Sequence, residues 1–191
     1  MKNNVLWQII TYYLIAYCSM LIPTYWYYYG PCNFLWLSDI GLLLTTLGLI
    51  INSRLYVSIA AVMTLLIELI WNIDFLTTLF FNNNLLQLAN YMLDRHYPLL
   101  LRLLSLFHVF MPVIWISYLV SYGYDTRALP YSIFFYWLII IMTYITTEPK
   151  QNINWAFMSL TIPPILWIIL LCIVFPLFII LPTHILFKKF F

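Results

Sequence analysis

Long apolar segments alternate with short polar stretches along almost the whole chain. A helix needs about 20 predominantly apolar residues to cross a membrane, with some variation for tilt. Six segments come close to or exceed that length, at approximately residues 5–28, 33–52, 55–75, 98–121, 131–147 and 164–186. The pattern predicts an all-α, polytopic membrane helix bundle with about six transmembrane helices, formed by a single domain over residues 1–191.

Two interruptions between these segments are longer than a turn. Residues 76–98, "LTTLFFNNNLLQLANYMLDRHYP", are half polar and too broken to cross a membrane. We interpret them as a short interfacial or re-entrant segment between the third and fourth helices. Residues 147–164, "TEPKQNINWAFMSLTIPP", form the second substantial loop.

The composition agrees with a membrane protein. Hydrophobic residues make up 65% of the chain and charged residues 7%, against roughly 25% charged in soluble domains. The net charge of +2 and the absence of a basic stripe exclude a nucleic-acid partner, so the expected partner is membrane lipid. The cysteines, Cys18, Cys32 and Cys172, lack the paired spacing of a disulfide framework or a zinc ribbon.

Basic residues predict the orientation, because lysine and arginine concentrate in cytoplasmic loops. With six helices both termini lie on one side, which collects Lys2, Arg54, Arg127, Lys188 and Lys189 and leaves Arg95, Arg102 and Lys150 opposite. We therefore expect both termini to be cytoplasmic.

Polar residues at helical spacing mark three of the segments. They are Cys32, Asn33, Trp36 and Asp39 in the second, Glu68, Trp71 and Asp74 in the third, and Arg102, Ser105 and His108 in the fourth. Burying charged side chains separately in hydrocarbon is costly, so these groups should converge. The two loops open on the same side and would contribute Tyr91, Asp94, Asn152, Asn154 and Trp155. We predict a polar cavity with an extracytoplasmic mouth.

Each polar group also has a purely structural interpretation. Asp39 or Glu68 can form an ion pair with Arg102 that fixes helix register. Ser105 can bond to a carbonyl of its own helix. His108 can be an interhelical hydrogen-bond partner, and Cys32 can be a small packing residue, although its place at a helix start favours a thiolate.

The stretches "PCNFLW", "SLFH", "GYDTRAL", "NINW" and "PTH" resemble a family of small bacterial multi-pass integral membrane proteins without an assigned activity. That resemblance implies the bacterial inner membrane as location. More remotely, a cysteine at the head of one span and a histidine inside a later one is similar to the YwaF-like membrane proteins, their acyltransferase relatives and the androgen-induced-gene hydrolases of fatty-acid esters. This likeness implies Cys32 and His108 as a reactive pair; the YwaF-like histidine two residues before the cysteine is Gly30 here.

The leading hypothesis is an acyl hydrolase or acyltransferase that acts on lipid esters and needs no cofactor or metal. Cys32 would attack the ester, with Ser105 as the alternative nucleophile, and His108 would be the general base. Asp39 or Glu68 would orient the imidazole, and Asn33 or Asn154 would donate to the oxyanion. Two alternatives stay open. One is a non-enzymatic lipid or small-molecule binder, transporter or complex subunit. The other is a metal-dependent hydrolase with His108 and Asp39, Asp74 or Asp94 as zinc ligands.

Overall fold

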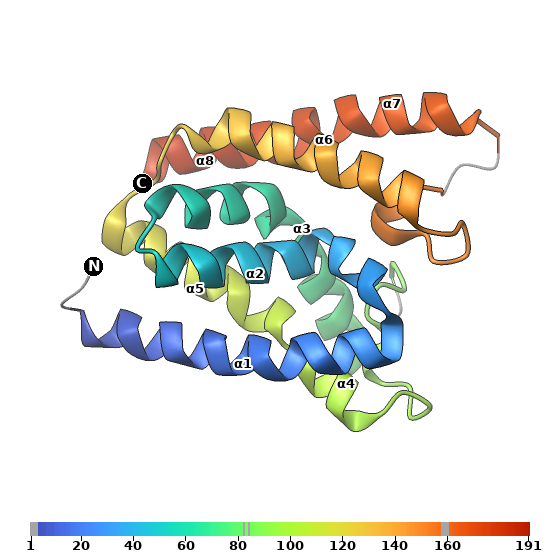
Figure 1. Cartoon of the computed structure of the whole chain (residues 1–191), viewed down its shortest axis with the longest axis horizontal. Coiled ribbons are helices and arrows are strands. Elements are labelled where there is room, and N and C mark those ends of the chain that lie inside the picture. Colours follow the sequence, from blue (N-terminus) through green and yellow to red (C-terminus); the bar gives the residue numbers. More distant parts are fainter. Residues whose placement is uncertain (1–3, 82, 84, 158–160) are drawn as a thin grey trace.

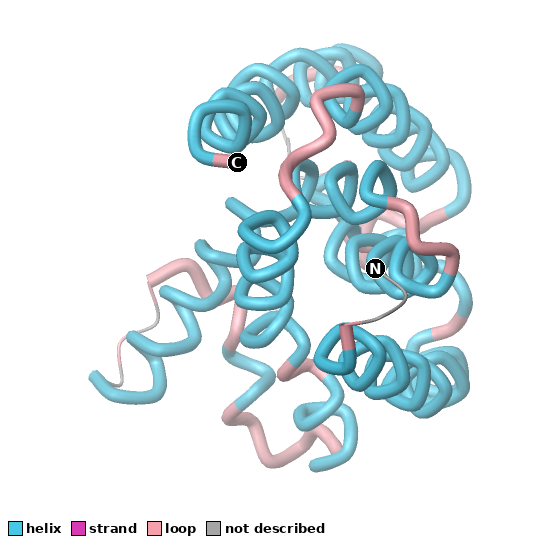
Figure 2. Tube along the Cα trace, turned by 90° about the vertical axis from the view of Figure 1, so that its left-hand side faces the viewer, coloured by secondary structure: helices cyan, strands magenta, loops and turns pink. Residues whose placement is uncertain are grey.

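Every regular element is helical in the part of the chain that the structure, a computed structural model, describes: residues 4–81, 83, 85–157 and 161–191. Figure 1 shows the helices in chain order, and Figure 2 shows them nearly end-on, packed side by side. The elements are α1 (Val5–Tyr29), η1 (Pro31–Leu35), α2 (Leu37–Ile50), α3 (Arg54–Phe81), η2 (Asn90–Met92), α4 (Leu99–Leu104), α5 (Phe107–Tyr122), α6 (Ala128–Thr146), η3 (Ile153–Trp155), α7 (Pro164–Phe175), η4 (Pro176–Ile180) and α8 (Leu181–Phe190).

Five helical stretches are long and apolar enough to cross a membrane, which agrees with the composition. They are α1, α3, α4 with α5, α6, and α7 through α8. Helix α2 has only 14 residues, or about 21 Å of rise, because the predicted second span is divided into η1 and α2 at Trp36. The all-helical fold is confirmed, with five helical stretches suited to crossing a membrane, and the count of six spans remains a prediction.

The helices differ in how much of their surface the protein covers. Helix α3 is central and buries residues along most of its length. Helix α7 buries only Ile168 and exposes apolar side chains such as Ile165 and Ile173. A helix that turns isoleucine outward on most sides is suited to lipid rather than to water.

The chain passes back and forth between two ends of the bundle (Figure 1). One end holds the start of α1, the turn at residues 51–53, the loop at 123–127 and the end of α8. The other end holds residues 30–36, the loop that contains η2, and the loop that contains η3. Both described ends of the chain therefore lie at the same end of the molecule, as an even number of passes requires.

Two glycines allow α2 and α3 to approach closely. A Cβ atom on Gly41 would lie 2.9 Å from Thr64 Oγ1, and one on Gly48 would lie 2.9 Å from Val57 Cγ2. The glycines are seven residues apart, so they share a face of α2. Small residues on one face are a common way for membrane helices to pack. This contact fixes the antiparallel register that brings the start of α2 beside the middle of α3.

Replacing Gly48 by leucine should therefore destabilise the protein, because the added side chain has to displace Val57 and the α3 backbone. Overpacking of this kind costs about 1–3 kcal/mol. Thermal unfolding in detergent, followed by tryptophan fluorescence, measures the change. Leu47→Phe is the matched control, because Leu47 precedes Gly48 in the chain and its side chain is 44% exposed. The unfolding temperature of this variant should stay close to that of the unmodified chain.

Candidate functional site

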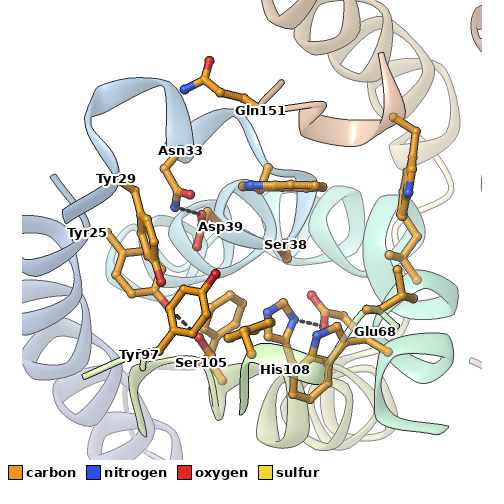
Figure 3. A pocket seen from close by; sticks show the side chains of 17 residues that line it. Tyr25, Tyr29, Asn33, Ser38, Asp39, Glu68, Tyr97, Ser105, His108 and Gln151 are labelled. Carbon is orange, nitrogen blue, oxygen red and sulfur yellow. Dashed lines mark hydrogen bonds and ion pairs between the residues drawn. The ribbon is translucent and has the colours of Figure 1, made fainter. Parts of the chain in front are cut away.

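A cavity of about 450 Å³ lies at the end of the bundle opposite the termini. Its wall comes from α1, η1 and the start of α2, α3, the break between α4 and α5, and both loops at that end (Figure 3). Tyr97, which lines it, is 39% exposed, so the wall reaches the protein surface. A cavity that contains part of the predicted polar residues is therefore present among segments that are far apart in the sequence.

His108 and Glu68 form a hydrogen-bonded pair on this wall. Nδ1 of His108 lies 2.5 Å from Oε2 of Glu68, whose side chain is 1% exposed. The imidazole is stacked between Trp71, at 4.4 Å between ring centroids, and Phe107, at 4.1 Å. Because Nδ1 is occupied, Nε2 is left as the histidine nitrogen for the cavity, and no described residue hydrogen-bonds it. The ring is thus held in one orientation with one nitrogen available.

Asn72 holds the backbones that carry this pair. Its Nδ2 donates to the carbonyl of Glu68 at 2.7 Å and to the carbonyl of His108 at 2.6 Å. The second carbonyl is free because its helical partner would be the N–H of residue 112, which is a proline inside α5 and has no N–H. The helix also breaks at Ser105 and Leu106, where the N–H of His108 bonds to the Ser105 carbonyl three residues back. The break therefore places His108 in the first turn of α5, fastened to α3.

Two carboxylate oxygens in the cavity wall have no hydrogen-bond partner among the described residues. Asp39 Oδ2 accepts from Asn33 Nδ2 at 3.0 Å, but Asp39 Oδ1 and Glu68 Oε1 are buried without a partner. Unpaired oxygens in buried carboxylates are rare, because each loses its hydration without compensation. These two atoms therefore mark a place where a hydrogen-bond donor belongs.

Aromatic side chains make up much of the remaining wall. Tyr25 pairs its hydroxyl with Ser105 Oγ at 2.8 Å and packs edge-on against Tyr29. Trp36 meets Trp155 from the other loop at 6.1 Å between centroids, and Tyr91 lies beside Tyr97. The cavity thus combines acidic groups with aromatic rings.

Cys32 lies outside the cavity, contrary to the convergence predicted for the second segment. Its thiol bonds to the carbonyl of Thr146 on α6 at 3.5 Å, whereas Asn33, Trp36 and Asp39 line the wall. The reason is that residues 31–35 form a 3₁₀ helix. The 3₁₀ helix ends at Trp36, whose ψ of 131° is not helical, so the α-helical spacing assumed from the sequence does not run from position 32 to position 39.

Arg102 also lies off the wall, and the ion pair predicted between it and Asp39 or Glu68 is wrong. Among the described residues the acidic partner of His108 is Glu68, while Arg102 donates to the carbonyl of Met92 at 3.3 Å. The helix break at Ser105 and Leu106 rotates His108 relative to Arg102. A continuous helix, as assumed from the spacing, would have kept all three on one face.

The remaining predicted acids have structural partners. Asp74 accepts from the backbone N–H groups of Leu86, Leu88 and Ala89 at 2.7–3.0 Å. Asp94 is paired with His96 in the exposed loop, where the backbone N–H and then the ring of His96 hold the pKa of the Asp94 carboxyl below its usual value. Neither aspartate lines the cavity.

The two asparagines of the second loop shape the backbone instead of lining the cavity. Asn152 and Asn154 have left-handed φ values of 40° and 53°, a conformation that asparagine adopts more readily than most residues. Asn154 also accepts from Leu37 N–H at 3.1 Å and donates to the Leu35 carbonyl at 2.7 Å. Both of its polar ends are thereby occupied, and it holds the start of α2.

Several lining residues escaped the sequence analysis: Tyr25, Tyr29, Ser38, Tyr97, Phe107 and Gln151. The tyrosines at 25 and 29 continue the buried stripe of α1 formed by Leu14, Cys18 and Leu21. That stripe was a usable signal, since residues three and four apart share a helix face. Gln151 and Tyr97 come from irregular loops, where no periodic sequence signal marks a residue as part of a cavity wall.

A zinc site of the kind considered above has little support in this arrangement. In the described ranges no group of three or more histidine, cysteine, aspartate or glutamate side chains is suited to a metal ion. Asp74 and Asp94 are engaged elsewhere, which leaves Asp39 as the one acid of that hypothesis on the wall with His108.

No family model matches the chain, and no curated protein or solved structure matches it either. The resemblances drawn from the short sequence motifs therefore remain predictions.

Proposed function

We propose that this chain is an integral membrane enzyme that hydrolyses or transfers the acyl esters of lipids. The observation that carries the proposal is the Glu68–His108 pair, with its imidazole fixed between two rings and Nε2 left for the cavity. A histidine oriented by a carboxylate is the usual general base of acyl transfer.

In the proposed reaction His108 Nε2 takes the proton of an attacking hydroxyl, water for hydrolysis or an alcohol for transfer. The oxygen bonds to the ester carbonyl carbon and gives a tetrahedral intermediate. When the intermediate collapses, its bond to the alkoxide breaks, and His108 returns the proton to that leaving group. Glu68 stabilises the imidazolium that exists between the two proton transfers.

The position of the pair along the bundle suits a lipid ester. Glu68 follows Arg54, the first residue of α3, by 14 residues, a rise of about 21 Å. The hydrocarbon core is about 30 Å thick, so the pair would lie roughly 10 Å below the far membrane surface. Ester groups of a lipid drawn slightly inward would meet His108 at that depth.

Charge supports cytoplasmic termini and therefore an extracytoplasmic cavity. Arg54, Arg127, Lys188 and Lys189 lie at the end of the bundle where α8 ends, and the cavity end has Arg95, Arg102 and Lys150. Lys150 is paired with Glu148. Lys2, which also entered the prediction, lies outside the described residues. A bacterial inner membrane with the basic end inside follows the positive-inside rule.

We further propose that α2 with η1 is the sixth span and that the loop after α3 is re-entrant. Six membrane spans would explain why both termini lie on the same side of the membrane. Burial of Ala89 and Met92 in that loop, against Trp71, gives it a packed apolar face, which a segment dipping into the bilayer requires.

The test is turnover by the purified protein in lipid nanodiscs, with p-nitrophenyl octanoate and a dioctanoyl glycerolipid as probes. Octanoate release above that of empty nanodiscs is the expected result. If neither ester is cleaved nor exchanged onto octanol, the enzymatic proposal fails, and a non-enzymatic binder, transporter or complex subunit becomes the better account.

Cys32→Ala should leave octanoate release unchanged within about twofold, because the thiol bonds to α6 and not to a cavity group. A thiol-directed probe should label Cys32 without inhibiting release. Loss of release in Cys32→Ala, with an unchanged unfolding temperature, would restore the cysteine as nucleophile and show that Cys32 moves into the cavity during turnover.

A further inference from the structure

The cavity wall has more negative than positive groups. Asp39 and Glu68 line it and are 2% and 1% exposed, and their one basic neighbour on the wall is His108. No lysine or arginine is among the lining residues that the structure describes. Glu68 has His108 as its partner, whereas Asp39 has no side-chain partner among the described residues besides the amide of Asn33. A cationic ligand would balance the remaining charge.

The two unpaired carboxylate oxygens indicate which type of cation the cavity favours. Asp39 Oδ1 and Glu68 Oε1 each need a hydrogen-bond donor. A primary ammonium has three N–H donors on one small centre, so it can supply the donors that unpaired carboxylate oxygens need. A quaternary ammonium has none and would leave both oxygens unpaired.

The aromatic walls favour the same ligand. Trp36 and Trp155 line the cavity, and indole faces attract cations most strongly among aromatic rings. Ile67, Leu88 and Phe107 line the same space and suit the hydrocarbon that an amphiphile carries next to its headgroup.

We propose that the cavity binds an amphiphile through a primary ammonium group, which Asp39 and Glu68 hold between the tryptophans. If the bound amphiphile is the substrate, it is an amine-headed lipid, and that part of the inference rests on the proposed function. The binding itself does not depend on turnover.

Three probes of equal chain length test it: n-octylammonium, octyltrimethylammonium and octanol, titrated into the protein in nanodiscs by calorimetry and tryptophan fluorescence. Octylammonium should saturate one site and bind about tenfold or more tightly than the other two, as expected for charge-assisted hydrogen bonds. Asp39→Asn should lower its affinity by about tenfold or more. Glu148→Gln removes an exposed acid at the same end and should not change the affinity.

Asp39→Asn keeps an acceptor for Asn33 and cannot place a charge in the buried wall, so its unfolding temperature should rise or stay the same. Equal binding of the three probes would overturn the proposal, as would unchanged affinity in Asp39→Asn or a lower unfolding temperature without loss of binding. None of the probes contains an ester. Saturable octylammonium binding without ester cleavage would refute the proposed enzymatic function and support the proposed ammonium site. Ester cleavage without selective binding of octylammonium would support the enzymatic function and refute the ammonium site.

Discussion

His108→Ala should lower octanoate release by about 10²- to 10⁴-fold, the usual contribution of a general base. The loss follows from the geometry, because the imidazole is the one basic side chain among the described lining residues. Glu68→Gln should also lower release, since the amide no longer stabilises the imidazolium through charge. Both variants are measured with p-nitrophenyl octanoate in nanodiscs, beside their thermal unfolding curves.

His96→Ala is the matched control for this pair of variants. His96 is bonded to Asp94 in the loop near the cavity, and its side chain is 94% exposed, so its removal should leave release unchanged. Full activity in His108→Ala with a normal unfolding curve would show that the Glu68–His108 pair is structural. Asn72→Ala tests the positioning of His108 separately from its role as a base. The variant loses both carbonyl contacts but keeps the imidazole, so octanoate release should fall.

The sequence was sufficient to predict the helical membrane fold and the general position of the cavity. Apolar segment lengths are a strong signal, since lipid allows few alternatives to helices. Of the residues predicted to converge, Asp39, Glu68, Ser105 and His108 line one cavity. The sequence did not indicate two places beside the cavity where the helices depart from α geometry, at Trp36 and at Ser105–Leu106.

Those departures explain the misplaced residues. A periodicity argument assumes a constant rotation of about 100° per residue, and a 3₁₀ turn or a break changes it. Cys32 and Arg102 each lie just before such a change, on the side away from the residues that line the cavity. No local residue signals these breaks unambiguously, because tertiary contacts such as Asn154 to Leu35 and Leu37 fix them.

Asp74 illustrates a second reason why helical spacing can mislead. It follows Glu68 and Trp71 at the spacing of a common face, but its carboxylate binds three backbone N–H groups of the loop at 86–89. The loop closes back onto α3, which the sequence does not indicate. A buried acid with 0% exposure is here the anchor of a cavity wall, since Leu88 and Tyr91 follow it in that loop.

Asp74→Ala should therefore be the most destabilising single change in the chain. It leaves three backbone donors without their acceptor, two of them part-buried and one buried, and each unsatisfied group costs about 1–3 kcal/mol. The unfolding temperature should fall, and limited proteolysis should cut between residues 85 and 98 before any other site. Asp74→Asn should be nearly as damaging, because its amide group would point at least one donor toward N–H groups.

Asp94→Asn changes an acid of the same loop whose side chain is 41% exposed, and it should preserve both stability and the cleavage pattern. Unaltered proteolysis in Asp74→Ala would mean that the loop is held by the Trp71 contacts alone, because those are the other packing that joins it to α3.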